Sequence, residues 1–397
     1  MSLAERALAA GISFTLTDEQ RALRELAHEF AEKEIRPKAA EYDRRSTHPA
    51  DIIAKAHELG LMNLHIPPEY GGPGLGALDG CLVDEELCWG CSGIGTAIMA
   101  NGLAAGPLIV AGSEEQKRRW LPGLATGEVQ TASAGTEPEA GSDAANIQTR
   151  AVREDGYYLV NGTKAFCTFA DVADVLFTYV RTDDAVPKHR GISLLLVEKP
   201  RGESFIPPYL TGKRIRTLGY RGMNTYLLYF NGLKVPAENL VGEEGKGFYY
   251  LMQGYEVARI QFAFRATGLA RAAYEAALKY AQDRVQFGRP IAQFQAIRFK
   301  LADMVTEIEA ARQLAFYAAE RFDRGERCDL EAGMAKLFAT EVAVRAARES
   351  LQIHGGVGYT MELPVQRYLR DALLLPIGEG TNEIQREVIA RRILGER

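Results

Sequence analysis

The chain has 397 residues, of which 47% are hydrophobic and 25% are charged, and its formal net charge is -5 at pH 7. This length predicts two or three domains with a sizeable core, and the acidic balance argues against non-specific binding to nucleic acid or acidic membranes. No uninterrupted apolar run reaches transmembrane length, and residues 1–6 resemble neither a secretory signal nor a transit peptide. A soluble, cytoplasmic protein is therefore expected.

The first part of the chain carries helical patterns. Thr17 followed by Gln20 is a capping-box signature, and apolar residues then recur at helical spacing until Pro37. Further helical patterns cover residues 51–59, 78–88 and 114–121. We therefore predict an N-terminal α-helical domain over residues 1–130.

The five cysteines do not predict a metal site. Cys81, Cys88 and Cys91 fall on one predicted helix, while Cys167 and Cys328 stand alone. A structural zinc site needs four ligands, and a redox Cys-x-x-Cys pair usually opens a helix after a strand. Buried thiols without a metal are expected.

The pattern changes after residue 131. Asp155-Gly156 and Asn161-Gly162 are typical of hairpin turns. Strand-forming residues bounded by polar turns occur at residues 175–180, 192–197 and 226–230. These patterns predict a small antiparallel β domain over residues 131–240.

Helical patterns return from residue 247 onward. The long segments at residues 269–283, 294–322 and 331–353 have the lengths of helices in a bundle. The sequence therefore predicts an α+β protein whose third domain, over residues 241–397, is a helical bundle.

Three motifs carry the chemistry. Gly378 and Gly380 flank Glu379, so a ligand can approach the backbone there and meet the carboxylate. Upstream stand Thr136-Glu137-Pro138-Glu139-Ala140-Gly141-Ser142-Asp143 and, between the two, residues 283–291 (DRVQFGRPI). Together and in this order, the motifs resemble the acyl-CoA dehydrogenase family, from about Leu16 to about Leu394.

The resemblance implies a fold and an activity. The family fold has an N-terminal α-helical domain, a middle antiparallel β-barrel or sandwich domain, and a C-terminal four-helix bundle. The implied reaction is FAD-dependent α,β-dehydrogenation of an acyl-CoA thioester to the trans-2-enoyl-CoA, as in fatty acid β-oxidation. Electrons would pass to electron-transfer flavoprotein, and the assembly would be a homotetramer that binds neither nucleic acid nor a membrane.

Glu379 matches the catalytic base of the family, which removes the α proton while flavin N5 takes the β hydride. A desolvated carboxylate suits this role because burial raises its pKa. Some relatives place the base before an arginine of the first bundle helix, but Ala258 stands at that position here. The alternative interpretation of Glu379 is an acid that stabilises a helix N-terminus.

The resemblance also implies the residues that bind FAD. Residues 134–142 match the flavin loop, Phe166 and Thr168 match an aromatic-x-hydroxyl step at the flavin ring, and Arg284 matches an arginine that reaches a neighbouring subunit's FAD. The alternative interpretations are a plain turn for residues 134–142, a strand-core aromatic for Phe166, and a cation at a helix end capped by Gly288 for Arg284. The full set is Ala134, Thr136, Gly141, Ser142, Phe166, Thr168, Arg284, Gln286, Phe287, Gln295, Gln352, Gly355, Gly356, Thr381 and Glu383.

Substrate contacts are expected at Ser142, Glu256, Arg259, Gly380, Gly95 and Met99. Arg259 matches an arginine near the thioester, with an internal ion pair to Glu256 as the alternative. Residues 91–101, where the acyl tail should enter, contain no Arg or Lys, so a monocarboxylic acyl chain is favoured over a glutaryl type. Straight-chain relatives often carry Tyr at the position of Gly378, so we hypothesise a wider pocket for longer, branched or cyclic acyl groups.

Other functions of the same fold remain as alternatives. Acyl-CoA oxidases are usually longer chains, flavin monooxygenases need no α-proton base, and a nitroalkane oxidase relative carries Asp at the position of Glu379. A non-catalytic flavoprotein that binds nucleic acid would favour a basic domain, which this acidic chain lacks.

Overall fold

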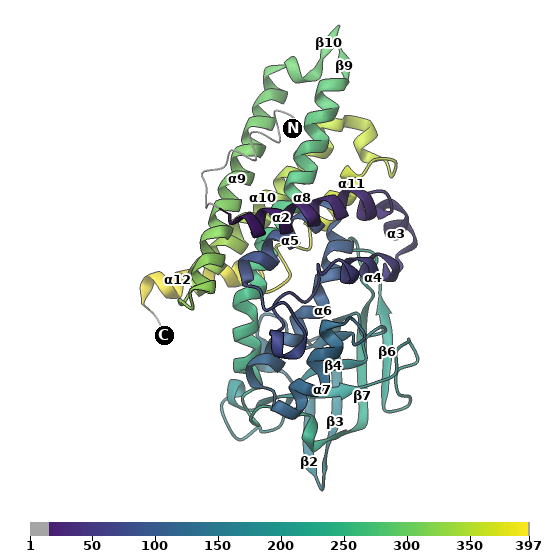
Figure 1. The fold of residues 1–397 in the computed structure, drawn as a ribbon, viewed down its shortest axis with the longest axis vertical. Helices are drawn as coiled ribbons and strands as arrows, with labels where there is room; N and C mark the ends of the chain where they lie inside the picture. Colours follow the sequence, from purple (N-terminus) through teal and green to yellow (C-terminus); the bar gives the residue numbers. More distant parts are fainter. Residues whose placement is uncertain (1–15, 396–397) are drawn as a thin grey trace.

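The computed structural model describes residues 16–395, apart from the side chains at positions 101, 103 and 104. Residues 1–6, which were considered above for targeting signals, lie outside this range. The protein is elongated, with helices at one end and a sheet at the other (Figure 1). The order of helical, β and helical domains agrees with the fold class expected from the sequence.

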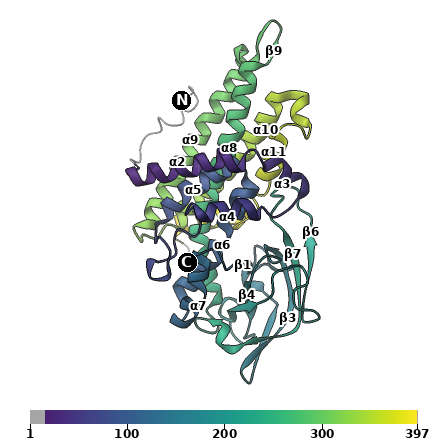
Figure 2. The ribbon, with the colours of Figure 1, turned by 45° about the vertical axis from the view of Figure 1, so that its right-hand side comes forward.

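The N-terminal domain consists of helices stacked beside the sheet and the bundle (Figure 2). The predicted capping box is present, because the Thr17 hydroxyl accepts a hydrogen bond from the Gln20 amide at 3.1 Å and Gln20 returns one. The helices of the domain are α2 (Asp18–Phe30), a π-helical turn (Ala31–Ile35), α3 (Ala39–Arg45), α4 (Ala50–Glu58), a 3-10 turn (Pro68–Tyr70), α5 (Ala77–Gly90), α6 (Ser92–Ala111) and α7 (Glu114–Ala125).

Helices α5 and α6 form the centre of this domain. Almost every residue of α5 from Leu78 onward is buried. Among residues 16–395, α6 alone is long and apolar enough to cross a membrane by length and composition, but 67% of its apolar window is buried inside the protein. Burial explains this composition, because a core helix is apolar all round.

The middle domain is one twisted sheet with the strand order β6-β7-β3-β2-β4-β5-β8, and β1 pairs with β4. Most neighbours are antiparallel, as expected, whereas β1 and the first residue of β2 pair in parallel with β4. The strands are β1 (Thr131–Ala134), β2 (Arg150–Glu154), β3 (Tyr157–Thr168), β4 (Val175–Arg181), β5 (Ile192–Glu198), β6 (Leu210–Ile215), β7 (Thr225–Pro236) and β8 (Leu240–Val241). Short 3-10 turns lie at Ala144–Asn146, Lys188–Arg190 and Ala237–Asn239.

One of the two predicted hairpins is correct. Asp155 and Gly156 connect β2 to β3, and Glu154 pairs with Tyr157. Asn161-Gly162 is not a turn, because both residues lie inside β3 where the register against β7 shifts. A β-bulge accounts for the glycine, whose φ is +148° and whose Cβ would lie 2.5 Å from the Thr149 hydroxyl.

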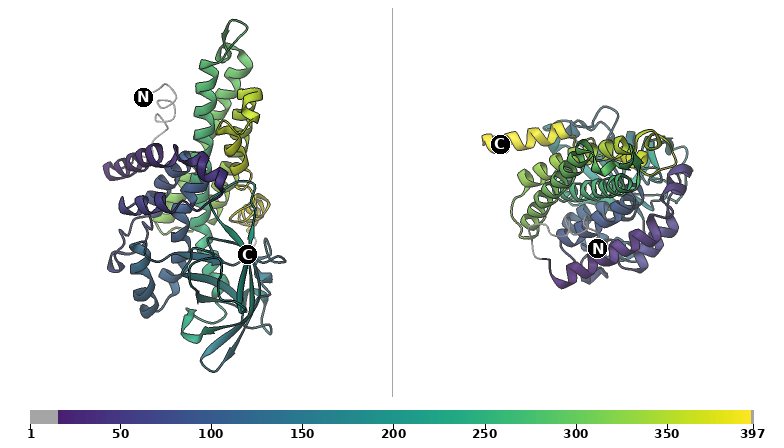
Figure 3. Two further views of the ribbon diagram at one scale, coloured as in Figure 1. Left: turned by 90° about the vertical axis from the view of Figure 1, so that its right-hand side faces the viewer. Right: turned by 90° about the horizontal axis from the view of Figure 1, so that it is seen from above.

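The C-terminal domain is built around α8 (Gly247–Asp283), which is 37 residues long and runs from the sheet to the far end of the molecule (Figure 3). A short hairpin of β9 (Val285–Gln286) and β10 (Arg289–Pro290) projects at that end (Figure 1). A 3-10 turn (Ile291–Gln293), α9 (Gln295–Asp323), α10 (Asp329–His354), a second 3-10 turn (Gly355–Tyr359), α11 (Val365–Ala372) and α12 (Asn382–Leu394) follow.

Buried ion pairs join α5 of the first domain to the bundle. The guanidinium of Arg271 on α8 donates to Glu85 at 2.7 Å and to both carboxylate oxygens of Glu86. Arg312 on α9 reaches the other oxygen of Glu85 at 3.1 Å. These charges are hydrogen-bonded as well as paired, which is what a buried pair needs to be tolerated.

Candidate active site

Glu379 lies in the loop between α11 and α12, with a left-handed backbone. Its φ is +54° and that of Gly380 is +84°, and the first value is uncommon for a residue with a side chain. The Gly380 carbonyl accepts hydrogen bonds from Lys336 Nζ at 2.9 Å and Gln385 Nε2 at 3.0 Å. The loop is therefore held in a strained conformation by buried groups of the bundle.

The surroundings of Glu379 suit a base. Burial raises the pKa of the Glu379 carboxyl above its ordinary value, and the charges of Arg265, Arg259 and Lys336 partly oppose the shift. A raised pKa makes a carboxylate a better proton acceptor. The side chain is only partly buried by exposed area, so the carboxyl is desolvated but the loop is reachable.

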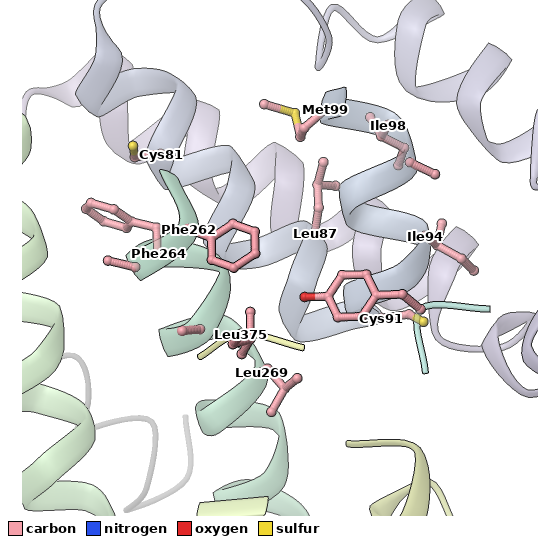
Figure 4. Packing of buried hydrophobic residues seen from close by; sticks show 14 of the residues in the cluster. Cys81, Leu87, Cys91, Ile94, Ile98, Met99, Phe262, Phe264, Leu269 and Leu375 are labelled. Atoms are coloured by element: carbon pink, nitrogen blue, oxygen red, sulfur yellow. The ribbon is translucent and has the colours of Figure 1, made fainter. Parts of the chain in front are cut away.

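The space beside Gly378 is filled by an aromatic ring. A Cβ at Gly378 would lie 2.9 Å from Cζ of Phe262, a buried residue of α8. Phe262 points toward Leu87 of α5, with Ile98 and Met99 of α6 beyond it (Figure 4). Phe262 thus takes the room that a tyrosine at position 378 would need, and this observation removes one premise of the wider-pocket hypothesis.

Gly95 and Met99 have different environments on α6. A Cβ at Gly95 would lie 2.7 Å from the backbone of Leu87, so the missing side chain lets α6 approach α5 closely. Met99 is buried and lies among the apolar residues of the same cluster. The smallness of Gly95 is accordingly explained by helix packing.

Arg259 lies on α8 near Glu379, as the resemblance implies. The guanidinium is buried, its Nε makes no hydrogen bond within the described protein, and the charges of Tyr255 and Glu379 act on its pKa. Within residues 16–395, Arg259 and Glu256 form no ion pair within 4 Å, and burial raises the pKa of Glu256. The internal ion pair is thus not formed, which leaves Arg259 available for an anionic ligand.

The predicted flavin loop and the aromatic-x-hydroxyl step come together at one end of the sheet. Ala134 ends β1, and the amide of Ala165 on β3 donates to the Thr136 carbonyl at 2.8 Å. Phe166 is 63% exposed with a φ of +55°, so it is not a strand-core aromatic. The exposed ring, the Thr168 hydroxyl and the open space around Gly141 fit a planar, phosphate-bearing cofactor such as FAD.

A buried lysine holds this loop from below. Lys164 is fully buried, and its ammonium group donates to the Gly135 carbonyl at 2.9 Å and to Glu137 Oε1 at 2.8 Å. The Glu137 carboxylate in turn accepts from the amides of Gln148 and Thr149 at 2.7 and 2.9 Å. Sequence reasoning missed Lys164, because a lysine on a strand usually indicates a solvent-facing position.

The remaining predicted FAD residues lie elsewhere. Thr381 is the N-cap of α12 and Glu383 is in its first turn, close to Glu379. Gln286, Phe287 and Arg284 lie on the projecting hairpin, with Gln295 at the start of α9, at the far end of the bundle from the sheet (Figure 1). Gln352, Gly355 and Gly356 lie where α10 ends, exposed like the hairpin. A single chain therefore does not bring the whole predicted set together.

The hairpin also corrects the interpretation of Gly288 as a helix cap. Helix α8 ends at Asp283, with an extended residue after it. Phe287 and Gly288 have φ values of +52° and +76° between the paired residues Gln286 and Arg289. Two left-handed residues in succession are typical of a type I′ hairpin turn.

Buried polar groups of the bundle form the part of the site that sequence reasoning did not find. Lys336 on α10 is buried beneath the Glu379 loop, and burial lowers the pKa of its ammonium group to about 8.

All five cysteines are buried free thiols, as expected. Within residues 16–395, no group of three or more His, Cys, Asp or Glu side chains is placed to hold a metal ion.

Comparison with known protein families decides the classification. Models of the N-terminal, middle and C-terminal domains of acyl-CoA dehydrogenase match residues 17–128, 132–233 and 245–394, in that order. The chain belongs to the acyl-CoA dehydrogenase family. It is an oxidoreductase of this class, as the motifs around Glu379 and the flavin loop indicate.

Individual acyl-CoA dehydrogenase relatives are similar over almost the whole chain. An acyl-CoA dehydrogenase of Bacillus subtilis is 43% identical over 381 residues, covering 96% of this chain and 99% of the relative. A (2S)-methylsuccinyl-CoA dehydrogenase of Cereibacter sphaeroides is 43% identical over 384 residues, covering 96% of this chain and 70% of the relative. The structure of butyryl-CoA dehydrogenase from Megasphaera elsdenii matches with a TM-score of 0.91 and 38% identity, covering 96% of this chain and all of the other.

Proposed function

We propose that this protein dehydrogenates an acyl-CoA thioester between its α and β carbons, with Glu379 as the base. The observation that carries the proposal is the Glu379 loop, in which a desolvated carboxylate with a raised pKa lies between two glycines near three cationic side chains. The acidity of an α proton matches such a carboxylate better than an ordinary, solvated one.

The residues of the site have different roles in the proposed reaction. Glu379 accepts the α proton, and its backbone amide stabilises negative charge on the thioester carbonyl. Lys336 and Gln385 hold the Gly380 carbonyl and so fix the direction of the Glu379 side chain. Arg259 contributes positive charge near an anionic ligand.

FAD fits the exposed surface formed by the flavin loop and Phe166. The residues that would hold it there are Ala134, Thr136, Gly141, Ser142 and Thr168. Thr381 and Glu383, which follow Glu379 in the chain, would also contact it. Bound FAD supplies the acceptor for the β hydride, which an unactivated C–H bond requires. The residues of the projecting hairpin, and those where α10 ends, would hold the FAD of a neighbouring subunit in a homotetramer. Electron-transfer flavoprotein is the proposed acceptor of the electrons.

Other activities of the fold fit less well. A monooxygenase needs no base, whereas Glu379 is desolvated and its loop is held by Lys336 and Gln385 through the Gly380 carbonyl. A nucleic-acid-binding protein would gain most of its affinity from positive charge, and the chain has a net charge of -5. A titration with duplex DNA, followed by fluorescence anisotropy, tests that alternative directly.

Anaerobic mixing of the FAD-loaded protein with straight, branched and cyclic acyl-CoA thioesters tests the proposal. We expect bleaching of the oxidised flavin band by one class, and its loss in Glu379→Gln with unchanged flavin content. Glu387→Gln is the matched control, because Glu387 lies on the adjoining α12, is exposed, and forms its ion pair with Arg391 at the surface. FAD-loaded protein that no thioester bleaches would refute the dehydrogenase function.

A further inference from the structure

A second buried arginine lies near Glu379, and the proposed reaction gives it no role. Arg265 is on α8, one turn beyond Phe262, and is 2% exposed. Of all charges, that of Arg265 has the largest effect on the pKa of Glu379. Positions three apart on a helix share a face, so Arg265 lies deeper on the same side of α8 as the ring that fills the space beside Gly378.

Arg265 forms an ion pair with an equally buried carboxylate, but the pair is not closed by a hydrogen bond. Arg265 Nε lies 3.5 Å from Oδ2 of Asp84, which is 0% exposed on α5. Among residues 16–395, Nε and Nη2 of Arg265 and both carboxylate oxygens of Asp84 have no hydrogen-bond partner. Buried polar atoms are almost always hydrogen-bonded, so four atoms without a hydrogen bond at one point require an explanation.

The neighbouring pair on the same two helices shows what a purely structural contact looks like. Arg271 lies further along α8 and makes three hydrogen bonds to Glu85 and Glu86 of α5. The Arg265–Asp84 pair is as deeply buried but is not closed by any hydrogen bond. The difference indicates that the donors of Arg265 and the acceptors of Asp84 are available to a ligand.

Further unpaired groups surround the pair. The buried hydroxyl of Tyr220 has no hydrogen-bond partner among the described side chains. Burial raises the pKa of this hydroxyl, and nearby Arg265 and Thr96 of α6 partly oppose the shift. Tyr220 has a left-handed φ of +52°, and the Asp371 carboxylate holds its amide at 2.7 Å. Such strain in a residue with a side chain is found mainly where function requires it.

There is also room on this face of α5. A Cβ built on Gly80 would meet no described atom within 4 Å apart from its chain neighbours and the backbone of its own helix, although Gly80 is buried. Gly80 precedes Asp84 by four residues and so lies on the same face of the helix. Thr96, on the other side, belongs to the segment along which the acyl tail is expected to enter.

We propose that Arg265, Asp84 and Tyr220 form a polar subsite at the far end of the acyl cleft. It would take an acyl group that carries an oxygen-bearing substituent in place of a terminal methyl. The substituent accepts from the Arg265 guanidinium, and a hydroxyl or amide can also donate to Asp84. The inference rests on the proposed dehydrogenase function and names its substrate class.

The charge balance favours an uncharged substituent. Arg265 and Asp84 together are neutral, and a substrate carboxylate would add a second negative charge beside Asp84. Burial raises the pKa of Asp84 to about 6, so a carboxylate would bind with uptake of a proton by Asp84. Residues 91–101 contain no Arg or Lys, but this absence does not exclude a polar acyl group. The cation of the proposed subsite is Arg265, which lies on α8.

Three thioesters of matched length test the subsite, namely pentanoyl-CoA, 5-hydroxypentanoyl-CoA and glutaryl-CoA. The rate of anaerobic flavin reduction is measured for each with the FAD-loaded protein. We expect the hydroxyl compound to be preferred over the methyl compound by on the order of ten-fold, as a hydrogen bond to a charged group would give. Preference for glutaryl-CoA would support the subsite with the carboxylate as occupant, whereas equal rates or preference for pentanoyl-CoA would overturn it.

Variants separate the subsite from a structural role. In Asp84→Leu/Arg265→Met the whole pair becomes apolar, which avoids an unpaired buried charge. We expect this variant to retain FAD and still to reduce its flavin with pentanoyl-CoA, at a rate changed by the higher pKa of Glu379, but to lose the preference for the polar compound. A preference that survives in this variant would show that the pair is structural.

A matched control uses Arg312→Met, which removes a buried arginine paired with a carboxylate of α5 outside the proposed subsite. It should keep the wild-type preference. Ratios between substrates are unaffected by any change in the pKa of Glu379, because all three thioesters use the same base. If no thioester reduces the flavin of the wild-type protein, the dehydrogenase function itself fails, and that result differs from an absent preference.

Discussion

Lys336 lies beneath the Glu379 loop, and its contacts make it a positioning residue for the base. Its ammonium group donates to the Gly380 carbonyl at 2.9 Å and to the Asn382 side chain at 3.0 Å. We expect Lys336→Met to slow flavin reduction by roughly ten-fold to a hundred-fold, since a displacement of about 1 Å can cost this much. Stopped-flow reduction by the best thioester measures the effect.

The pH profile distinguishes positioning from general damage. The positive charge of Lys336 lowers the pKa of Glu379 against the larger effect of burial. Removing the charge in Lys336→Met raises that pKa, so the acid limb of the rate profile moves to higher pH. Lys336→Arg keeps the charge and should leave the limb in place. A limb that does not move in Lys336→Met would contradict the electrostatic part of the prediction.

Gly378 and the Phe262 ring are packed against each other, and the substitution Gly378→Tyr tests this packing. Gly378→Tyr introduces a Cβ that would lie 2.9 Å from the Phe262 ring, and such overpacking typically costs about 1–3 kcal/mol. We expect a lower Tm in the single variant and recovery in Phe262→Ala/Gly378→Tyr. A tyrosine at position 378 that leaves Tm unchanged without the second substitution would show that the ring is free to move.

These residues show where sequence reasoning ends. Glu379 could be proposed because two glycines and the Gly-Thr motif mark it locally. Lys336 and Arg265 carry no such mark, since a lysine or arginine on a helix normally points to solvent. Their roles depend on which helices pack together, and helix packing between distant segments leaves no short motif.

At the level of elements, the flavin loop depends on the strand below it. Lys164 and Glu137 are both buried and tie β3 to the loop. Lys164→Met leaves the Glu137 carboxylate unpaired, and breaking a buried pair in this way typically costs roughly 3–5 kcal/mol. We expect lower stability and weaker FAD binding, measured by denaturant unfolding and by flavin titration. Glu137→Gln/Lys164→Met should recover part of the stability, and a single variant that binds FAD like the wild type would exclude the proposed support.

The same strands illustrate the accuracy of local signals. Asp155-Gly156 and Asn161-Gly162 look alike in sequence, but only the first is a turn. The second glycine lies in a bulge where Thr149 approaches β3 closely. A turn and a bulge both need a glycine-compatible backbone, so only the pairing with β7 distinguishes them.

At the level of the whole molecule, the predicted FAD residues divide into separate groups. Gly141 and Thr168 belong to the sheet domain, whereas Arg284 and Phe287 lie at the hairpin at the other end of the bundle (Figure 1). Phe287 is 93% exposed, and an exposed aromatic at the tip of a projecting hairpin is unfavourable unless another surface covers it. A site completed by a second copy of the chain accounts for both facts.

Mixing two defective chains tests this assembly. Arg284→Glu damages the hairpin and Gly141→Arg damages the flavin loop, so neither homo-oligomer should bind FAD well. In a mixed pair, the intact loop of one chain meets the intact hairpin of the other, while the second site carries both defects. Random exchange after mild dissociation should therefore restore about one quarter of the sites, as expected for a two-fold interface. Flavin retained after gel filtration measures the recovery. If the site is complete within one chain, mixing restores nothing.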